Sequence, residues 1–386
     1  MKLYTLESRK FPKACFHWTL FDAACKSKLA IGMCCLLLAS AFVMGCGSDE
    51  EDESNEQLQG ETFDAGTMLN DFANTVVLAT YTELDNKAGE LLTSVKALAL
   101  DTSQANLERA QQAWKATRTP WEQSEAFLFG PVDTQGLDPA LDSWPVDHIN
   151  LQSVLDSGDS LTVDFVSGLE DTQKGFHTIE FLLFRDGNQR KASDLTSREL
   201  EYLVSTTENL KVSTSQLRLA WAPEGENFSS AVAQAGVGSA VYPSQSAAVQ
   251  EMVNGMIVIA DEVANGKISD PYNESDTTLV ESQFSFNSIS DFQDNIRGIQ
   301  NVYMGKFATD GQGLNEFVNG QDPDLDARFQ QEVQAAIDAI GAIPDPFRDS
   351  ITVNRGAVQV AIDAVSKVQQ TLEQDILPLV QSSEFN

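Results

Sequence analysis

Residues 65–100 read AGTMLNDFANTVVLATYTELDNKAGELLTSVKALAL. Apolar side chains recur along this stretch at steps of three and four residues, at Met68, Phe72, Val76, Leu84, Leu91, Leu92, Val95 and Leu98. An α-helix turns once every 3.6 residues, so this spacing places the apolar side chains on one face. The stretch therefore predicts a long helix with one buried face.

The same periodicity continues through most of the chain beyond residue 100. It predicts helices at about 103–129 (with Ser103 as N-cap and Pro120 as a kink or break), 147–156, 161–184, 194–221, 244–265, 288–305, 323–341 and 349–380. Gly, Pro and polar residues predict an ordered loop at 131–147, a polar loop at 266–287 and a glycine-rich stretch at 308–321. Sustained period-two alternation, which is typical of strands, is absent from the sequence. The predicted fold class is all-α.

The helical pattern breaks around Arg185-Asp186-Gly187-Asn188, and we place a domain boundary there. The prediction is two tandem up-and-down helical bundles, an N-terminal one at 63–187 and a C-terminal one at 188–386. A weak similarity between residues 175–184 and 295–304 suggests that the bundles come from an internal duplication.

The N-terminus reads as an export leader. Lys26 and Lys28 precede an apolar run, residues 29–44, which has the length of a signal-peptide core and is short for a membrane-spanning helix. The run ends in Val43-Met44-Gly45-Cys46, which resembles the lipobox of bacterial lipoproteins. We expect a signal peptide at 1–45 and a lipidated Cys46; the alternative is an uncleaved anchor helix.

Residues 46–62 contain the acidic run Asp49-Glu50-Glu51-Asp52-Glu53. Such a run repels itself and buries no apolar area, so we expect an extended tether. No aspartate directly follows Cys46, which favours the outer membrane. The predicted location is an outer-membrane lipid anchor, with the protein facing the periplasm or exposed at the cell surface.

Composition excludes several classes of site. Every cysteine lies at or before Cys46, so the processed chain has no disulfide framework, no thiolate metal site and no cysteine nucleophile. Only His148 and His177 follow the leader. The formal net charge of -32 argues against nucleic acid as a partner and is compatible with cationic ligands.

The sharpest candidate for a site is Gly175-Phe176-His177-Thr178-Ile179-Glu180. His177 and Glu180 share one face of a helix, so an imidazole nitrogen and a carboxylate can converge on one ion. The alternative is a core histidine that is hydrogen-bonded to its glutamate. The surrounding apolar residues make a polar pair costly to bury without partners.

A second group of candidates lies in the predicted helix at 103–129. Trp114, Arg118, Trp121 and Glu125 are spaced by four, three and four residues, and Glu122 lies beside them. A helix that continues through Pro120 would present these side chains on one face. The alternative is a surface helix with an ordinary Arg118–Glu122 ion pair. The following loop adds Asp142 and Asp147 as candidate oxygen donors.

Together, residues 114–131, 141–147 and 175–180 resemble the imelysin family, whose hallmark is GxHxxE, and residues 291–305 resemble its second-domain motif. The resemblance implies two helical bundles with a site at their interface. Members were first described as metallopeptidases, and others are linked to iron uptake. Transferred by motif, the resemblance implies site roles for His177, Glu180, Glu122, Glu125 and Arg297, to which we add Arg118, Asp142 and Gly175 as supporting residues.

Ligand chemistry favours metal binding over proteolysis. A zinc peptidase needs protein ligands, an open position and a general base, but Phe181 stands where an inverted zincin motif would have its second histidine. One histidine among many carboxylates suits iron or another first-row ion. We expect a divalent or trivalent ion, iron first and zinc as the alternative, with iron-uptake transporter or receptor components as partners. A surface interaction or carbohydrate-binding lipoprotein is a third possibility, which predicts scattered carboxylates.

Overall fold

The computed structural model describes residue 63 and residues 65–385. The predictions for the signal peptide, Cys46 and the acidic tether therefore lie outside the described residues. The described part contains no β-strand, and its one isolated bridge joins Lys306 and Asp310. The predicted all-α fold class is confirmed. None of the described helices is both long and apolar enough to cross a membrane.

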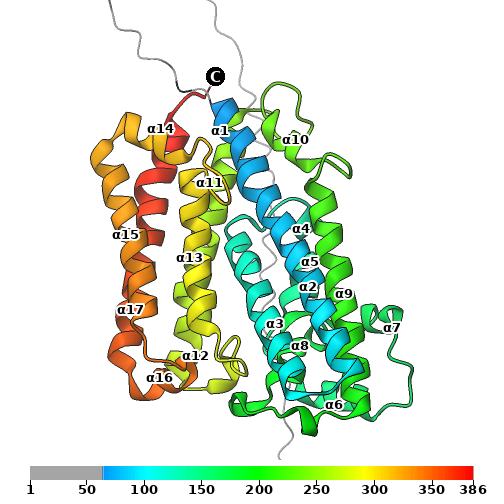
Figure 1. Cartoon of the computed structure of the whole chain (residues 1–386). Coiled ribbons are helices and arrows are strands. Elements are labelled where there is room, and N and C mark those ends of the chain that lie inside the picture. Colours follow the sequence, from blue (N-terminus) through cyan, green and yellow to red (C-terminus); the bar gives the residue numbers. More distant parts are fainter. Residues whose placement is uncertain (1–62, 64, 386) are drawn as a thin grey trace, which may run out of the picture. The chain divides into compact units, whose positions relative to one another are not determined.

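Four helices form the first bundle, as Figure 1 shows in blue, cyan and green: α2 (Ala79–Leu100), α3 (Gln104–Ser124), α8 (Gly175–Phe184) and α9 (Ser197–Trp221). Helix α2 packs against α3 and α9, and α8 packs against the same two helices. The chain enters this bundle through α1 (Ala65–Asp71) and the π-helix η1 (Phe72–Leu78), which run directly into α2. Residues 65–100 are thus one continuous helical stretch.

The second bundle, yellow-green to red in Figure 1, contains α11 (Gln245–Asp261), α13 (Ser288–Met304), α15 (Pro323–Gly341) and α17 (Arg355–Thr371). These four helices close a ring in the same way, because α13 packs against α11 and α15, and α17 packs against α15 and α11. Contacts between α3 and α13 join the two bundles. The prediction of two helical bundles is confirmed, whereas internal duplication stays a prediction.

Shorter helices complete the described chain. They are η2 (Glu125–Phe127), α4 (Pro131–Thr134), α5 (Leu137–Asp142), α6 (His148–Asp156), α7 (Val163–Ser167), η3 (Asp171–Gln173), η4 (Asp186–Asn188), η5 (Ala192–Asp194), α10 (Phe228–Ala233), η6 (Glu262–Ile268), α12 (Ser269–Glu274), η7 (Thr277–Leu279), α14 (Leu314–Gln321), α16 (Phe347–Val353), η8 (Leu372–Ile376) and α18 (Leu377–Ser382). The expected loop at 131–147 therefore contains two short helices, and the expected loop at 266–287 begins with helix.

The predicted boundary at residue 187 falls before α9, and α9 packs along α2 and α8 of the first bundle. Residue 63 and residues 65–385 belong to a single compact unit. The division at 187 stays a prediction, but the contacts of α9 cross it. Helix α3 also continues through Pro120, so Arg118, Trp121 and Glu122 stay on one helix.

Packing between the bundles depends on a glycine in α13. A Cβ atom at Gly298 would lie 2.5 Å from the backbone oxygen of Gln123 in α3. Only a residue without a side chain permits this approach of the two helix backbones. The close contact places the Glu122–Glu125 end of α3 beside α13, where the candidate site lies.

Candidate metal centre

Helix α8 carries His177 into the interior, and all ten of its residues are buried. The helix starts at Gly175, whose φ of +77° is rarely adopted by other residues. A Cβ atom there would lie 2.3 Å from the backbone oxygen of Leu141, at the end of α5. Gly175 thus lets α5 approach α8, and this approach puts Asp142 next to His177.

The Nδ1 side of His177 faces its own helix. Nδ1 lies 2.9 Å from Glu180 Oε2. The other oxygen, Oε1, accepts hydrogen bonds from the backbone N–H groups of Phe284 and Ser285 at 3.0 and 2.8 Å and from the Ser285 hydroxyl at 2.8 Å. Both oxygens of Glu180 therefore have partners, and Glu180 holds the imidazole in one orientation.

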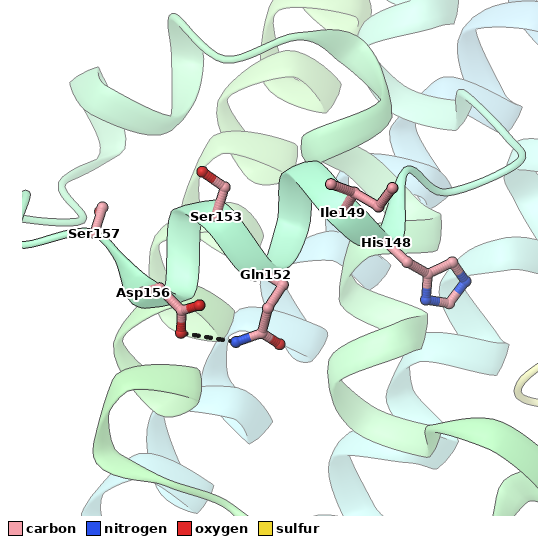
Figure 2. A pocket seen from close by; sticks show the side chains of 6 residues that line it. All are labelled: His148, Ile149, Gln152, Ser153, Asp156 and Ser157. Carbon is pink, nitrogen blue, oxygen red and sulfur yellow. Dashed lines mark hydrogen bonds between the residues drawn. The ribbon is translucent and has the colours of Figure 1, made fainter. Parts of the chain in front are cut away.

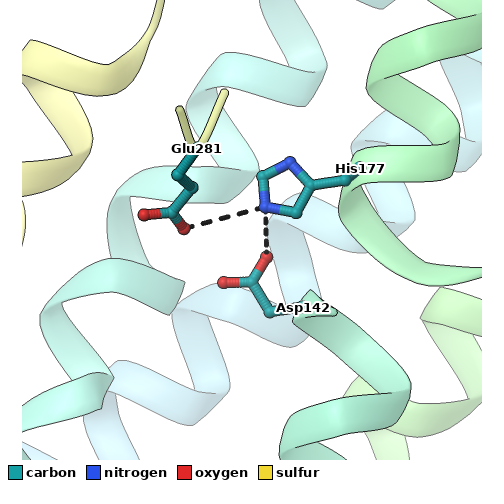
Figure 3. A group of neighbouring side chains, drawn as sticks. All are labelled: Asp142, His177 and Glu281. Atoms are coloured by element: carbon teal, nitrogen blue, oxygen red, sulfur yellow. Dashed lines mark ion pairs between the residues drawn. The ribbon is translucent and has the colours of Figure 1, made fainter. Parts of the chain in front are cut away.

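The Nε2 side of His177 faces two carboxylates (Figure 3). Nε2 lies 3.1 Å from Asp142 Oδ1 and 3.7 Å from Glu281 Oε1. Asp142 ends α5, and Glu281 lies between η7 and α13. One potential ligand atom from each of the three residues lies within 4.8 Å of the others, and all three side chains are buried. They form the one His/Cys/Asp/Glu group with such geometry among the described residues.

Arg118 from α3 links these carboxylates. Its guanidinium pairs with Asp142 and Glu122, and Nη2 donates to Glu281 Oε1 at 2.7 Å. Its Nε lies 3.7 Å from Asp291 Oδ1. Asp142 also accepts a hydrogen bond from Trp121 Nε1 at 2.6 Å. Arg118 and Trp121 thus fix the Asp142 carboxylate beside His177.

Lys267 from η6 occupies the other end of the cluster. Its Nζ lies 2.6 Å from Glu125 Oε2, 3.3 Å from Glu122 Oε2 and 3.1 Å from Glu281 Oε2. Asn295 from α13 donates through Nδ2 to Glu122 Oε2 and Glu125 Oε2, both at 2.6 Å. Residues of both bundles therefore build one buried polar cluster.

Carboxylates outnumber cations in this cluster. The buried acidic side chains are Glu122, Glu125, Asp142, Glu180, Glu281 and Asp291. Against these six stand the permanent cations Arg118 and Lys267, together with His177. Buried charge is costly unless it is paired, so the surplus of carboxylates favours either bound protons or a further cation.

The pKa values follow from this balance. Burial would raise the pKa of Asp142, but Arg118 and His177 outweigh it and hold that pKa below its ordinary value. The pKa of Glu281 is lowered to about 2, because Lys267, His177 and Arg118 outweigh its burial. Burial would lower the pKa of His177, yet Asp142, Glu180 and Glu281 raise it well above the usual value.

The pKa values of Glu125 and Asp291 are raised rather than lowered. Burial raises the pKa of Glu125 to about 8 despite the adjacent Lys267, and neighbouring carboxylates add to the effect. Burial likewise raises the pKa of Asp291 to about 6, with Arg118 opposing it. The lowered pKa values of Asp142 and Glu281 keep both carboxylates charged near neutral pH, and both flank His177 Nε2.

The donor set fits a metal ion. His177 Nε2 and Glu281 Oε2 are buried and make ion-pair contacts at 3.1 Å, with Asp142 and Lys267 respectively, but neither atom has a hydrogen bond of regular geometry among the described residues. Ligand bonds of about 2.1 Å at right angles place neighbouring donor atoms about 3 Å apart, which is close to the observed separation of Nε2 and Asp142 Oδ1. One imidazole nitrogen and two carboxylate oxygens suit first-row divalent ions and iron.

A small pocket of about 180 Å³ leads to the cluster. Its lining includes Glu125, Asp138, Asp142 and Glu262 together with Trp144. Burial and neighbouring carboxylates raise the pKa of Asp138 to about 7. An acidic pocket of this size admits an ion with its water, whereas small-molecule sites usually enclose about 300 Å³ or more.

The sequence profile of the imelysin family matches residues 77–373. The chain belongs to the imelysin family. It is 33% identical to iron-regulated protein A of Synechococcus elongatus over 361 residues, which covers 92% of this chain and 94% of that protein.

Two solved structures have a similar fold. A candidate iron-regulated protein A precursor from Parabacteroides distasonis is 29% identical, with a TM-score of 0.76 over 83% of this chain and 97% of that one. An imelysin-like protein from Psychrobacter arcticum is 12% identical, with a TM-score of 0.68 over 82% of this chain and 95% of that one. This second similarity concerns the fold alone.

The structure brings most of the predicted site residues of this imelysin-family chain together. His177, Glu180, Glu122, Glu125, Arg118 and Asp142 lie in the buried cluster, and Gly175 supports it. The carboxylates of these residues lie together, whereas a surface interaction protein was expected to have them scattered. The arrangement differs from our expectation in one respect, because Glu180 contacts His177 Nδ1 while Asp142 and Glu281 face Nε2.

Arg297 lies outside the cluster. It pairs with Asp294 at 3.0 Å, and its side chain is 40% exposed. Asn295, two residues earlier on the same helix, reaches Glu122 and Glu125 instead. Two residues correspond to a rotation of about 200° around an α-helix, so Asn295 and Arg297 point in nearly opposite directions.

The other candidate donors, Asp147 and His148, also lie outside the cluster. Asp147 accepts a hydrogen bond from the backbone N–H of Asn150 and caps α6. His148 starts α6, and its ring packs against Phe181 and Phe284 at centroid distances of 4.8 and 5.6 Å. Figure 2 shows His148 at one end of an open hollow along the surface of α6. His177 is therefore the histidine of the site.

Sequence reasoning missed Glu281, Lys267 and Asn295. Glu281 and Lys267 lie in the stretch 266–287, which we had interpreted as a polar loop. Asn295 belongs to the stretch 291–305, whose resemblance to the family's second-domain motif pointed to the correct helix. Nothing in the local pattern around Lys267 separates it from a surface lysine.

Proposed function

We propose that this protein is a metal-binding member of the imelysin family that acts in iron acquisition, with a lipid anchor at Cys46 in the outer membrane. The observation that carries the proposal is the convergence of Asp142, His177 and Glu281. Their donor atoms are buried, lie within 4.8 Å of one another and include an imidazole nitrogen without a hydrogen bond. The ion would meet one nitrogen and two oxygen ligands, with Glu180 holding the imidazole from behind.

Iron is the favoured ion. A mixed nitrogen and carboxylate donor set suits iron(II) and zinc alike, since affinity order alone does not separate such ions. The relative from Synechococcus elongatus is named an iron-regulated protein, and this name supports iron over zinc. The acidic pocket beside the site supports capture of a cation, because carboxylates at its mouth raise the local cation concentration.

Peptide cleavage is a weaker candidate for this site. A metallopeptidase needs a general base near the metal-bound water, yet both oxygens of Glu180 already have partners. The adjoining pocket of about 180 Å³ is also too small for an extended peptide. We therefore expect binding without hydrolysis.

The test is calorimetric titration of iron(II), under anaerobic conditions, into protein purified without a histidine tag. Zinc, copper and calcium are titrated in parallel. His177→Ala, Asp142→Asn and Glu281→Gln should each weaken iron binding by more than the roughly 10–100-fold that is typical of residues behind the ligands. Glu180→Gln should fall within that range. Circular dichroism checks that each variant is folded.

His148→Ala is the matched control, because it removes the other histidine that follows the leader without touching the cluster. It should bind iron as the wild type does. Wild-type affinity in His177→Ala, Asp142→Asn and Glu281→Gln would reject the site. Metal-dependent cleavage of peptides that disappears in the same variants would favour the peptidase alternative.

The anchor is tested separately. Cells that express the wild-type chain should incorporate radioactive palmitate into the protein, and Cys46→Ala should abolish this labelling. Cys34→Ala, which removes a cysteine of the apolar leader run, is the control and should be labelled normally. Undiminished labelling of Cys46→Ala would overturn the lipid anchor and leave the metal site unaffected.

A further inference from the structure

Lys267 lies in an unusual place for a lysine. Its side chain is among the largest fully buried ones of the described chain, and it belongs to the π-helix η6, which joins α11 to α12. π-Helical turns are rare and occur frequently at functional sites. Its Nζ also lies 5.3 Å from the centre of the Trp144 ring. An ammonium group in such a place requires a full set of partners, because its transfer from water is costly.

The partners of Lys267 are the kind of ligands that a metal ion would use. Oxygens of Glu125, Glu122 and Glu281 lie at 2.6, 3.3 and 3.1 Å from Nζ. Asn295 binds two of these carboxylates, and its own Oδ1 is buried without a hydrogen bond. The three carboxylates around Nζ are a hard-oxygen donor set, which suits divalent ions such as manganese, magnesium and iron(II).

Glu281 connects this position to the candidate metal centre. Its Oε1 lies 3.7 Å from His177 Nε2, and both of its oxygens lie near Lys267 Nζ, at 3.3 and 3.1 Å. Figure 3 shows the carboxylate of Glu281 directed at the imidazole. One carboxylate is thus shared by two cation positions. In two-metal sites, carboxylates of a helical bundle are shared between ions about 3.5–4 Å apart.

We propose that the Lys267 ammonium fills the second position of a two-cation centre, and that it thereby limits the site to one metal ion bound by Asp142, His177 and Glu281. The inference rests on the proposed function for that first position. Glu281 faces both the ion and the ammonium, and Lys267 prevents a second ion from reaching Glu122 and Glu125. Lys267 is accordingly a specificity-determining residue, because it sets the number of ions and the net charge that the cluster accepts.

A purely structural role for Lys267 makes a different prediction. If the ammonium only neutralises buried carboxylates, its removal should destabilise the protein and leave the number of bound ions unchanged. If it occupies a cation position, its removal should open that position to a metal. The number of ions per chain separates these roles, whereas stability alone does not.

The experiment compares wild type, Lys267→Met and Lys211→Met, all without a histidine tag. Methionine keeps much of the volume of lysine and removes its charge. Lys211 is the control, because it lies on α9 outside the cluster and its Nζ also pairs with a carboxylate, that of Asp85 on α2, at 2.6 Å. After equilibration with iron(II) or manganese(II) and removal of free ion, native mass spectrometry and elemental analysis count the ions per chain. We expect one for wild type and Lys211→Met, and two for Lys267→Met.

A second variant identifies the ligands of the new position. Glu125→Gln added to Lys267→Met should return the count from two ions to one, because Glu125 makes the shortest contact with Nζ. His177→Ala added to Lys267→Met should instead empty the first position and also leave one ion. Two ions in both double variants would overturn the assignment of the positions.

The outcomes separate this inference from the proposed function. One ion in both wild type and Lys267→Met would overturn the inference and leave the proposed function intact. No ion in wild type would reject the proposed function. If Lys267→Met then bound one ion where wild type binds none, this would still support a cation position at Lys267. If Lys267→Met is unfolded without metal, divalent ions should restore its helical circular dichroism with two ions bound. A variant that stays unfolded at saturating ion overturns the inference.

Discussion

The molecule contains a second, partly buried ion network, and it differs from the candidate metal centre in its charge balance. At the start of α9, Glu199 pairs with Arg185 and with Arg190, the latter at 2.7 Å. Its Oε2 also accepts from the backbone N–H and hydroxyl of Thr196 at 2.8 and 3.0 Å. One carboxylate thus has two guanidinium groups and a helix cap, whereas the candidate metal centre has six carboxylates and two permanent cations.

This difference indicates which network is built for a ligand. The Glu199 network has no surplus of carboxylates, and the pKa of Glu199 is lowered to about 2 because its hydrogen bonds and the two arginines outweigh its burial. The cluster around Arg118 instead contains carboxylates whose pKa values are raised, namely Glu125 and Asp291. A surplus of buried carboxylates, more than the presence of ion pairs, distinguishes the candidate site from the Glu199 network.

The largest expected effect on stability comes from removing one cation from each network. Arg118→Met should destabilise the metal-free protein by about 3–5 kcal/mol, because it leaves several buried carboxylates without their partner. Arg190→Met should cost about 1–2 kcal/mol, since Glu199 keeps Arg185 and Thr196. Urea unfolding monitored by circular dichroism measures both. Equal losses in the two variants would show that the networks do not differ as we describe.

The second prediction concerns pH in the metal-free protein. Glu125 has a folded-state pKa of about 8, above its unfolded value, so its contribution to stability is complete below about pH 4.5 and is lost as pH rises through 8. The loss amounts to at most about 1.4 kcal/mol per pH unit. The melting temperature should therefore fall between pH 5 and pH 8. Glu125→Gln should flatten this slope, whereas Glu199→Gln should keep it. An unchanged slope in Glu125→Gln would contradict the assignment.

The smallest expected effect belongs to Glu199. Glu199→Gln should reduce the free energy of unfolding by about 1–2 kcal/mol, through weaker hydrogen bonds to Thr196 and the arginines. Iron affinity should stay at the wild-type value, because the cluster around His177 is untouched. Calorimetry and urea unfolding of one preparation measure the two quantities. A tenfold loss of iron affinity would show that the two networks are coupled.

Sequence periodicity predicted those helices whose termini carry strong signals. Helix α15 begins at Pro323 with Asp322 as its cap and ends at Gly341, and the predicted bounds agree. The stretch 131–147 was misread because Pro and Gly also start helices, as Pro131 does in α4 and Gly136 does before α5. Helix α11 continues through the π-helix η6 into α12. The spacing of apolar residues does not reveal a π-helix, so the sequence did not predict this continuation.

Only the part of the site that lies in the first bundle was predictable from the sequence. His177 and Glu180 were detectable because a polar pair within the apolar α8 sequence needs partners. Lys267 and Glu281 became part of the site through docking of the two bundles, with contacts that span 145 residues between Lys267 and Glu122 and 163 between Arg118 and Glu281. Spacing within one segment carries no information about such contacts.

The long sequence separations within the cluster also affect how the protein folds. Helices α3, α5 and α8 supply Arg118, Asp142 and His177, whereas Lys267 and Glu281 follow only after about two thirds of the chain. Loop closure over such distances is slow compared with the formation of local helices. We expect the bundles to form first and the cluster last. Until the bundles meet, the cluster residues of each bundle carry unbalanced charge. An ion that lowers this repulsion would then accelerate the final step of folding as well as stabilise its product.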